Sequence, residues 1–138
     1  MRETHDPQTI LLIDDDTNIR KMAKRRLEQE GYRVVAAAEG HEGLELAKAE
    51  RPQAILLDLM MPRMDGREVL RQLKADPETR GIPVILLTVI GPDDELYMPV
   101  QLGEVLHVSK PYQPEDLLRK IHLALSTKAD ESNGQTAS

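Results

Sequence analysis

"LLIDDD", residues 11–16, places three carboxylates directly behind an apolar run. The run "TILLI" (9–13) is nearly continuous Ile and Leu, which is typical of a strand buried on both faces of a parallel sheet. Three neighbouring like charges repel one another at the end of such a strand. A strand that ends in three acids needs a group that compensates their negative charge.

Four further apolar runs recur along the chain, namely "YRVVAAA" (32–38), "AILLDLM" (54–60), "PVILLT" (83–88) and "VLHVS" (105–109). Helical patterns separate or follow them at 18–30, at 40–50, at 66–75 and from Pro114 through Ala124. The alternation of strand and helix predicts an α/β fold of the (βα)5 type, with a parallel sheet and right-handed crossovers.

Two segments depart from this regular pattern. The fourth crossover, "IGPDDELYMPVQLGE" (90–104), contains Pro92 and Pro99, which predict a short or irregular helix. Residues 126–138 have no apolar periodicity, so we expect a disordered tail or a frayed helix end. With a flexible leader at 1–8, the folded domain is predicted to span 9–125.

Composition limits the classes of function. The 138 residues predict one domain, and the formal net charge of -6 argues against binding to nucleic acid or to a membrane surface. There is no Cys, the first ten residues are polar, and no apolar run approaches the about 20 residues that span a bilayer. We expect a cytoplasmic location.

Polar residues gather where the predicted strands end. Asp14–Asp16 follow the first strand, Asp58 lies near the end of the third, Thr88 ends the fourth, and Lys110 and Pro111 follow the fifth. The carboxyl ends of parallel strands meet at one edge of a sheet, where ligands bind. Converging carboxylates without His favour a hard ion such as Mg²⁺, and a Lys with a Thr hydroxyl suits a phosphoryl group. The set indicates phosphoryl transfer onto an aspartate.

The sequence resembles the receiver domain of bacterial two-component response regulators, including the chemotaxis regulators. The resemblance covers about residues 9–125 and depends on four motifs, which are "LLIDDD" (11–16), "LLDLMMPRMDG" (56–66), "ILLT" (85–88) and "SKPY" (109–112). It implies a three-layer, flavodoxin-like sandwich whose five parallel strands have the order 2-1-3-4-5.

The resemblance also implies a phosphoacceptor and a metal site. Asp58 would accept a phosphoryl group from a phosphohistidine. Asp15, Asp58 and the backbone carbonyl of Met60 would bind Mg²⁺, or Mn²⁺, directly, and Asp14 would bind it through water. The third acid, Asp16, is expected to cap the following helix.

Further site residues are carried over from the same motifs. Lys110 and Thr88 would contact phosphoryl oxygens, the bond between Lys110 and Pro111 would be cis, and Asp65 and Gly66 would shape the loop before the third helix together with Pro62. Thr88 would act as a switch with the residue three before the lysine. That residue is usually aromatic, and here it is His107.

The resemblance predicts a signalling switch that phosphorylates itself but turns over no substrate, so we do not expect an enzyme. Its donor would be a sensor histidine kinase or a phosphotransfer protein. The output partner, or a second copy of the chain, would bind the face formed by 90–104, the fifth strand and the last helix. The basic run "RKMAKRR" (20–26) is interpreted as a solvated helix face, with donor docking as the second interpretation.

Two alternatives stay open at this point. A degenerate receiver that is never phosphorylated would serve only as an interaction module, and the complete set of acids, Thr and Lys counts against it. An aspartyl-phosphate phosphatase usually carries a second carboxylate two residues after the nucleophile, and Met60 occupies that position here.

Overall fold

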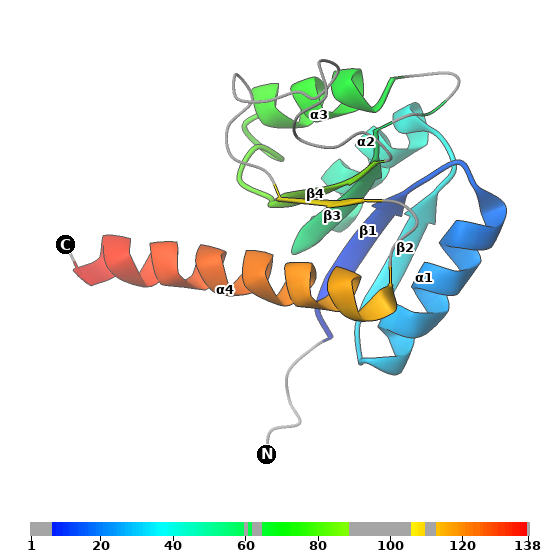
Figure 1. Ribbon diagram of the computed structural model, residues 1–138. Coiled ribbons are helices and arrows are strands. Elements are labelled where there is room, and N and C mark those ends of the chain that lie inside the picture. Colours follow the sequence, from blue (N-terminus) through cyan, green and yellow to red (C-terminus); the bar gives the residue numbers. More distant parts are fainter. Residues whose placement is uncertain (1–6, 60, 62–64, 89–105, 110–112, 138) are drawn as a thin grey trace.

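A computed structural model of the protein describes residues 7–59, 61, 65–88, 106–109 and 113–137, and for residues 88, 107, 109 and 127–137 it describes the backbone alone. Within these residues the chain forms a five-stranded parallel sheet with the order β2-β1-β3-β4-β5. The strand order is the one that the resemblance implied. Figure 1 shows the helices packed around this sheet.

Strands and helices alternate along the described chain as far as β4. The elements are β1 (Thr9–Ile13), α1 (Thr17–Gln29), β2 (Arg33–Ala37), α2 (Gly40–Glu50), β3 (Ala54–Asp58), α3 (Gly66–Ala75), β4 (Val84–Thr88), β5 (Leu106–Ser109) and α4 (Pro114–Ala137). Each strand lies within its predicted run. The third strand ends at Asp58, two residues before the end of its run.

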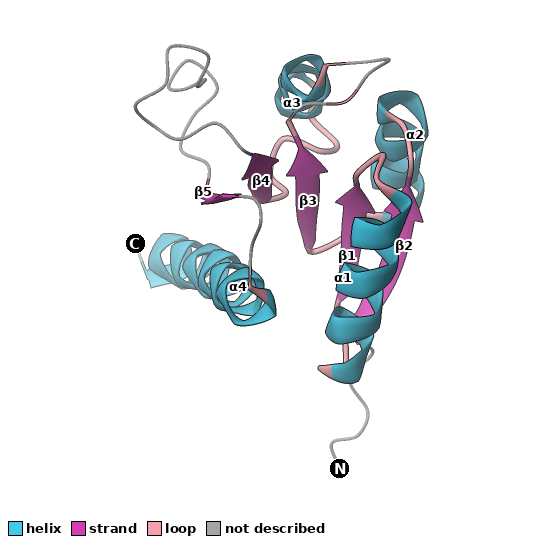
Figure 2. Ribbon diagram, turned by 45° about the vertical axis from the view of Figure 1, so that its right-hand side comes forward, coloured by secondary structure: helices cyan, strands magenta, loops and turns pink. Residues whose placement is uncertain are grey.

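The apolar residues of each strand fill two cores because successive side chains point to opposite faces of a sheet. Ile10 and Leu12 of β1 pack in one core with buried residues of α1 and α4, whereas Leu11 and Ile13 pack in the other with buried residues of α2 and α3. The fold is therefore a three-layer sandwich, and Figure 2 shows its sheet and helices from a second direction.

The structure bears on two expectations about the helices. The apolar spacing within residues 18–30 predicts Met22 near the same helix face as Ala23 and Leu27, but 51% of the surface of Met22 is exposed, whereas Ala23 and Leu27 are buried. For residues 126–138 the expectation was a disordered tail or a frayed helix end, and in the structure α4 continues to Ala137, past the end of the sheet (Figure 1).

The predicted irregular helix at 90–104 lies outside the described residues. Among the residues that are described, no helix combines the length and apolar character that crossing a bilayer requires.

Candidate metal site

Three acidic side chains meet at the carboxyl edge of the sheet. β1 and β3 are adjacent and parallel, and Ile13 pairs with Leu57, so Asp14 and Asp58 come next to each other as the following residues of the two strands. One carboxylate oxygen from each of Asp14, Asp15 and Asp58 lies within 4.8 Å of the others. The predicted convergence of these acids is therefore present in the structure.

The three acids differ in exposure. Asp14 is fully buried, and Asp58 has 4% of its surface exposed, whereas Asp15 is exposed. Charged groups are rarely placed so deep unless they are hydrogen-bonded, paired or bound to a metal. The site thus combines a buried pair of acids with a third acid that faces the solvent.

The loop between β1 and α1 is held by its own side chains. The side chain of Asp14 accepts a hydrogen bond from the amide of Asp16 at 2.9 Å, and the side chain of Asp16 accepts one from the amide of Ile19 at 3.0 Å. Asp16 is the N-cap of α1, which confirms the role expected for the third acid.

The loop after β3 returns close to the end of that strand. The amide of Gly66 donates a hydrogen bond to the carbonyl oxygen of Leu59 at 3.0 Å. A Cβ at position 66 would overlap the carbonyl oxygen of Asp58 and lie 2.6 Å from the Cα of Leu59. Only glycine therefore allows α3 to begin this close to Asp58.

Asp65 caps the start of α3 beside this glycine. Its side chain accepts hydrogen bonds from the guanidinium of Arg67, at 2.9 and 3.2 Å, and from the amide of Arg67 at 2.9 Å. The guanidinium hydrogen bonds, helped by the amide, lower the pKa of the Asp65 carboxyl. Asp65 therefore holds the loop as a charged cap.

The acidic cluster suits a small divalent cation. Each of its ligand atoms is a carboxylate oxygen, which is the donor that Mg²⁺ prefers. The three carboxylate oxygens lie within 4.8 Å of one another, close enough that Asp14, Asp15 and Asp58 would together hold one cation.

The other predicted site residues are described in part or not at all. The backbone of Thr88 ends β4 at the same edge of the sheet, one residue beyond Leu87, which pairs with Asp58. The side chains of Thr88 and His107 lie outside the described part of the chain, as do Met60, Pro62, Lys110 and Pro111. Their predicted roles, including the cis peptide bond, stay predictions.

Sequence reasoning missed one residue of this region. Arg20 was assigned to the solvated face of the first helix, but its Nη1 donates a hydrogen bond to the backbone carbonyl oxygen of Asp14 at 2.9 Å. The position of Arg20 in the second turn after the Asp16 cap was the available signal. From there, a long side chain can reach back to the loop.

Comparison with known proteins agrees with this geometry. The family model of the response regulator receiver domain matches residues 10–122. Response regulator MprA from Mycolicibacterium vanbaalenii is 36% identical over 132 residues, which are 95% of this chain and 56% of that relative. MprA from Mycobacterium leprae is 38% identical over 124 residues, which are 89% and 54%. The chain spans about half the length of these curated relatives.

Solved structures of similar fold include two receivers. Chemotaxis protein CheY4 of Vibrio cholerae has a TM-score of 0.80 at 29% identity, covering 86% of this chain and 99% of that one. The receiver domain of a sensor histidine kinase from Pseudomonas aeruginosa PAO1, which holds a magnesium ion in its active site cleft, has a TM-score of 0.79 at 28% identity, covering 87% and 98%. The chain therefore belongs to the family of response regulator receiver domains of two-component signalling systems.

Proposed function

We propose that this receiver domain accepts a phosphoryl group on Asp58, from a phosphohistidine and with Mg²⁺, and that phosphorylation switches its binding surface. One observation carries the proposal, namely that the carboxylate oxygens of Asp14, Asp15 and Asp58 lie within 4.8 Å of one another at the end of β3. Family membership supports it, because receiver domains are signalling domains of response regulators.

The chemistry is a displacement at phosphorus. A carboxylate oxygen of Asp58 attacks the phosphorus of the phosphohistidine, a P–O bond forms, the P–N bond breaks, and the imidazole leaves and is protonated by solvent. A divalent cation, when bound, neutralises charge on the acids and on the phosphoryl oxygens. Asp14, Asp15 and Asp58 would hold it, joined in the family by the carbonyl of Met60.

Two further residues complete the proposed site by resemblance. Lys110 would pair with one phosphoryl oxygen, and the hydroxyl of Thr88 would hydrogen-bond another. The fold supports this for Thr88, because β4 brings its backbone to the same edge as Asp58. Movement of Thr88, coupled to His107, would shift the population between inactive and active conformers.

The donor would be a sensor histidine kinase or a phosphotransfer protein, and the output partner would bind the face formed by 90–104, β5 and α4. The curated relatives named response regulator MprA are longer than this chain. We propose that phosphorylation here is read out by another domain or another protein that binds this face.

Intact mass after incubation with acetyl phosphate and Mg²⁺ tests the proposal. We expect the chain to gain one phosphoryl group, and Asp58→Asn to gain none. Asp16→Asn is the matched control, because it neutralises a nearby acid while Asn keeps the helix cap. The wild-type chain without Mg²⁺ should also remain unmodified.

The same experiment separates the proposal from a degenerate receiver. An unmodified wild-type chain, in a preparation where a second receiver is fully phosphorylated, would contradict the phosphoacceptor role and favour an interaction module. Modification that persists in Asp58→Asn would assign the acceptor to another residue.

A further inference from the structure

The contact between Arg20 and the acidic loop is not part of the proposed phosphoryl transfer. Arg20 lies in the second turn of α1 and is half-buried. Its Nη1 donates a hydrogen bond to the backbone carbonyl oxygen of Asp14 at 2.9 Å, and its Nη2 lies 3.5 Å from the hydroxyl oxygen of Thr17. The guanidinium therefore joins the loop after β1 to the first turn of α1.

The carbonyl that Arg20 holds belongs to the peptide unit between Asp14 and Asp15. A peptide unit is planar, so fixing its orientation fixes one backbone dihedral on each side, the ψ of Asp14 and the φ of Asp15. These two dihedrals set the directions in which the two side chains leave the backbone. The hydrogen bond from Arg20 therefore affects the direction of two of the three acidic side chains.

Two other hydrogen bonds of the loop do not act on this peptide unit. The Asp16 amide donates to the side chain of Asp14, and the Asp16 side chain accepts from the amide of Ile19. Neither bond involves the carbonyl oxygen of Asp14 or the amide of Asp15, which form this peptide unit. Arg20 donates to the carbonyl oxygen of Asp14, which belongs to this unit.

We propose that Arg20 is a positioning residue for the acidic cluster, because it holds the Asp14–Asp15 peptide unit so that both carboxylates face Asp58. The part of the inference that concerns Mg²⁺ rests on the proposed function. A guanidinium suits this role because it is always charged, donates from a rigid planar group and forms charge-assisted hydrogen bonds.

Arg20 also brings a positive charge near the acids, and that charge alone would have the opposite effect. A nearby cation weakens the binding of a second cation, so its removal would tighten Mg²⁺ binding. Loss of positioning instead weakens binding, because the carboxylates must then be ordered by the metal itself. The sign of the change in Mg²⁺ affinity separates the two roles.

The test compares Arg20→Met with Lys21→Met. Lys21 is the next residue of α1 and is exposed, and its side chain makes no hydrogen bond or ion pair within the described part of the chain. Both variants lose one positive charge from the same turn of the same helix, and only Arg20→Met loses the bond to Asp14. The pair is therefore matched in charge.

The first readout is the Kd for Mg²⁺, measured by calorimetry or by an NMR titration of the Asp15 amide. We expect Arg20→Met to raise this Kd about tenfold, as for other residues that orient metal ligands, and Lys21→Met to leave it unchanged or lower it. An Arg20→Met Kd that equals or falls below the wild-type value would overturn the inference, as would equal weakening in both variants.

The second readout needs no metal. Hydrogen exchange at the amides of Asp16 and Ile19 in the metal-free protein reports on the loop, and we expect it to be faster in Arg20→Met than in Lys21→Met. Equal exchange in the two variants would overturn the inference. Urea unfolding of both variants identifies a general loss of stability, which would lower the unfolding free energy without changing the Kd.

The two proposals fail in different ways. If the wild-type chain does not bind Mg²⁺, the proposed function fails together with the metal part of this inference, while the exchange measurement still decides whether Arg20 positions the loop. If the wild-type chain binds Mg²⁺ and takes up a phosphoryl group but Arg20→Met behaves like Lys21→Met, only the inference on Arg20 fails.

Discussion

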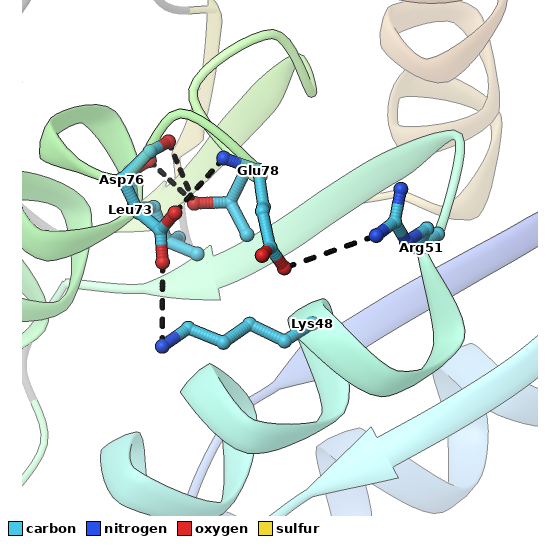
Figure 3. A network of polar contacts seen from close by, with 6 residues as sticks. Lys48, Arg51, Leu73, Asp76 and Glu78 are labelled. Atoms are coloured by element: carbon cyan, nitrogen blue, oxygen red, sulfur yellow. Dashed lines mark hydrogen bonds and ion pairs between the residues drawn. The ribbon is translucent and has the colours of Figure 1, made fainter.

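Acidic side chains have different neighbours at the carboxyl edge and at the amino edge of the sheet. At the carboxyl edge, Asp14, Asp15 and Asp58 bring their oxygens within 4.8 Å of one another. At the amino edge, where α2 and α3 end, acids face bases. Lys48 lies 3.3 Å from a carboxylate oxygen of Asp76, and Arg51 lies 3.8 Å from one of Glu78 (Figure 3).

The difference distinguishes acids that stabilise the fold from acids that suit a ligand. At the amino edge the protein supplies its own counter-charges, and the amide of Glu78 also donates to the side chain of Asp76 at 2.8 Å. The resulting network ties the end of α2 to the end of α3 and needs no ligand. At the carboxyl edge three carboxylates lie close together, an arrangement that suits a bound cation.

The largest expected effect concerns the close backbone contact at the carboxyl edge, between Gly66 and the end of β3. Gly66→Ala places a Cβ against the backbone of Asp58, the last residue of the central strand β3, and of Leu59, which follows it. We expect the free energy of unfolding to fall by about 3 kcal/mol in a urea titration followed by circular dichroism.

The control for this substitution is Gly81→Ala, because a Cβ at position 81 meets no heavy atom within 4 Å. Its unfolding free energy should stay within about 0.5 kcal/mol of the wild-type value. Equal losses at both positions would contradict a special role for the close approach to Asp58, because the change in backbone entropy from Gly to Ala favours the folded chain.

The next effect belongs to the amino edge. Thr79 is buried, and its hydroxyl donates a hydrogen bond to the carbonyl oxygen of Leu73 at 2.6 Å, which closes the end of α3. Thr79→Val keeps the shape but leaves that carbonyl without this bond, so we expect a loss of about 1.5 kcal/mol in urea unfolding. Thr79→Ser keeps the hydroxyl and should lose only about 0.8 kcal/mol for the missing methyl group. A larger loss for Ser than for Val would contradict the role of the bond.

Neutralising an acid at the carboxyl edge should stabilise the metal-free chain. Asp15→Asn removes one of the three crowded charges, and because Asp15 is exposed the gain in unfolding free energy should be up to about 1 kcal/mol. The same variant should lose most of the increase in Tm that Mg²⁺ gives the wild-type chain. Asp16→Asn, outside the cluster, should show neither change. A destabilised Asp15→Asn would mean that acid crowding carries no cost here.

Neutralising an acid at the amino edge should instead lower the free energy of unfolding. The amide of Glu78, and then Lys48, lower the pKa of Asp76 from its ordinary value of 3.8. The charged carboxylate therefore stabilises the fold above that value, and this stabilisation is lost as the pH falls through the lowered pKa. Asp76→Ala should unfold at lower urea concentration than the wild-type chain near neutral pH, and the two curves should converge in acid. A difference that is independent of pH would exclude a contribution from the charge.

The smallest effect concerns Arg51, which ends α2 in the left-handed region with a φ of 47°. Glycine adopts this conformation without strain, so Arg51→Gly should raise the unfolding free energy by about 0.5 kcal/mol. Arg51→Ala keeps the strain and loses only the exposed pair with Glu78, so it should change the unfolding free energy by less than about 0.5 kcal/mol. Destabilisation in both variants would show that the ion pair outweighs the strain.

The order of elements and the chemistry of the acidic edge could be predicted from the sequence. Continuous Ile and Leu runs predicted the buried strands, and the position of Asp58 and of Asp14–Asp16 at strand ends predicted their convergence, because parallel strands end at one edge. The N-cap role of Asp16 followed from its place before an apolar helical pattern.

Contacts between segments far apart in the sequence, and those made by long side chains, were decided by the tertiary structure alone. The exposure of Met22 depends on how α1 crosses the sheet, and the bond from Arg20 to Asp14 depends on which rotamer a flexible side chain adopts. The pairing of Lys48 with Asp76 requires α2 and α3 to end side by side. Local patterns determine which residues are buried and where strands end, whereas the partner of a surface charge is fixed only when the packed elements bring distant residues within reach.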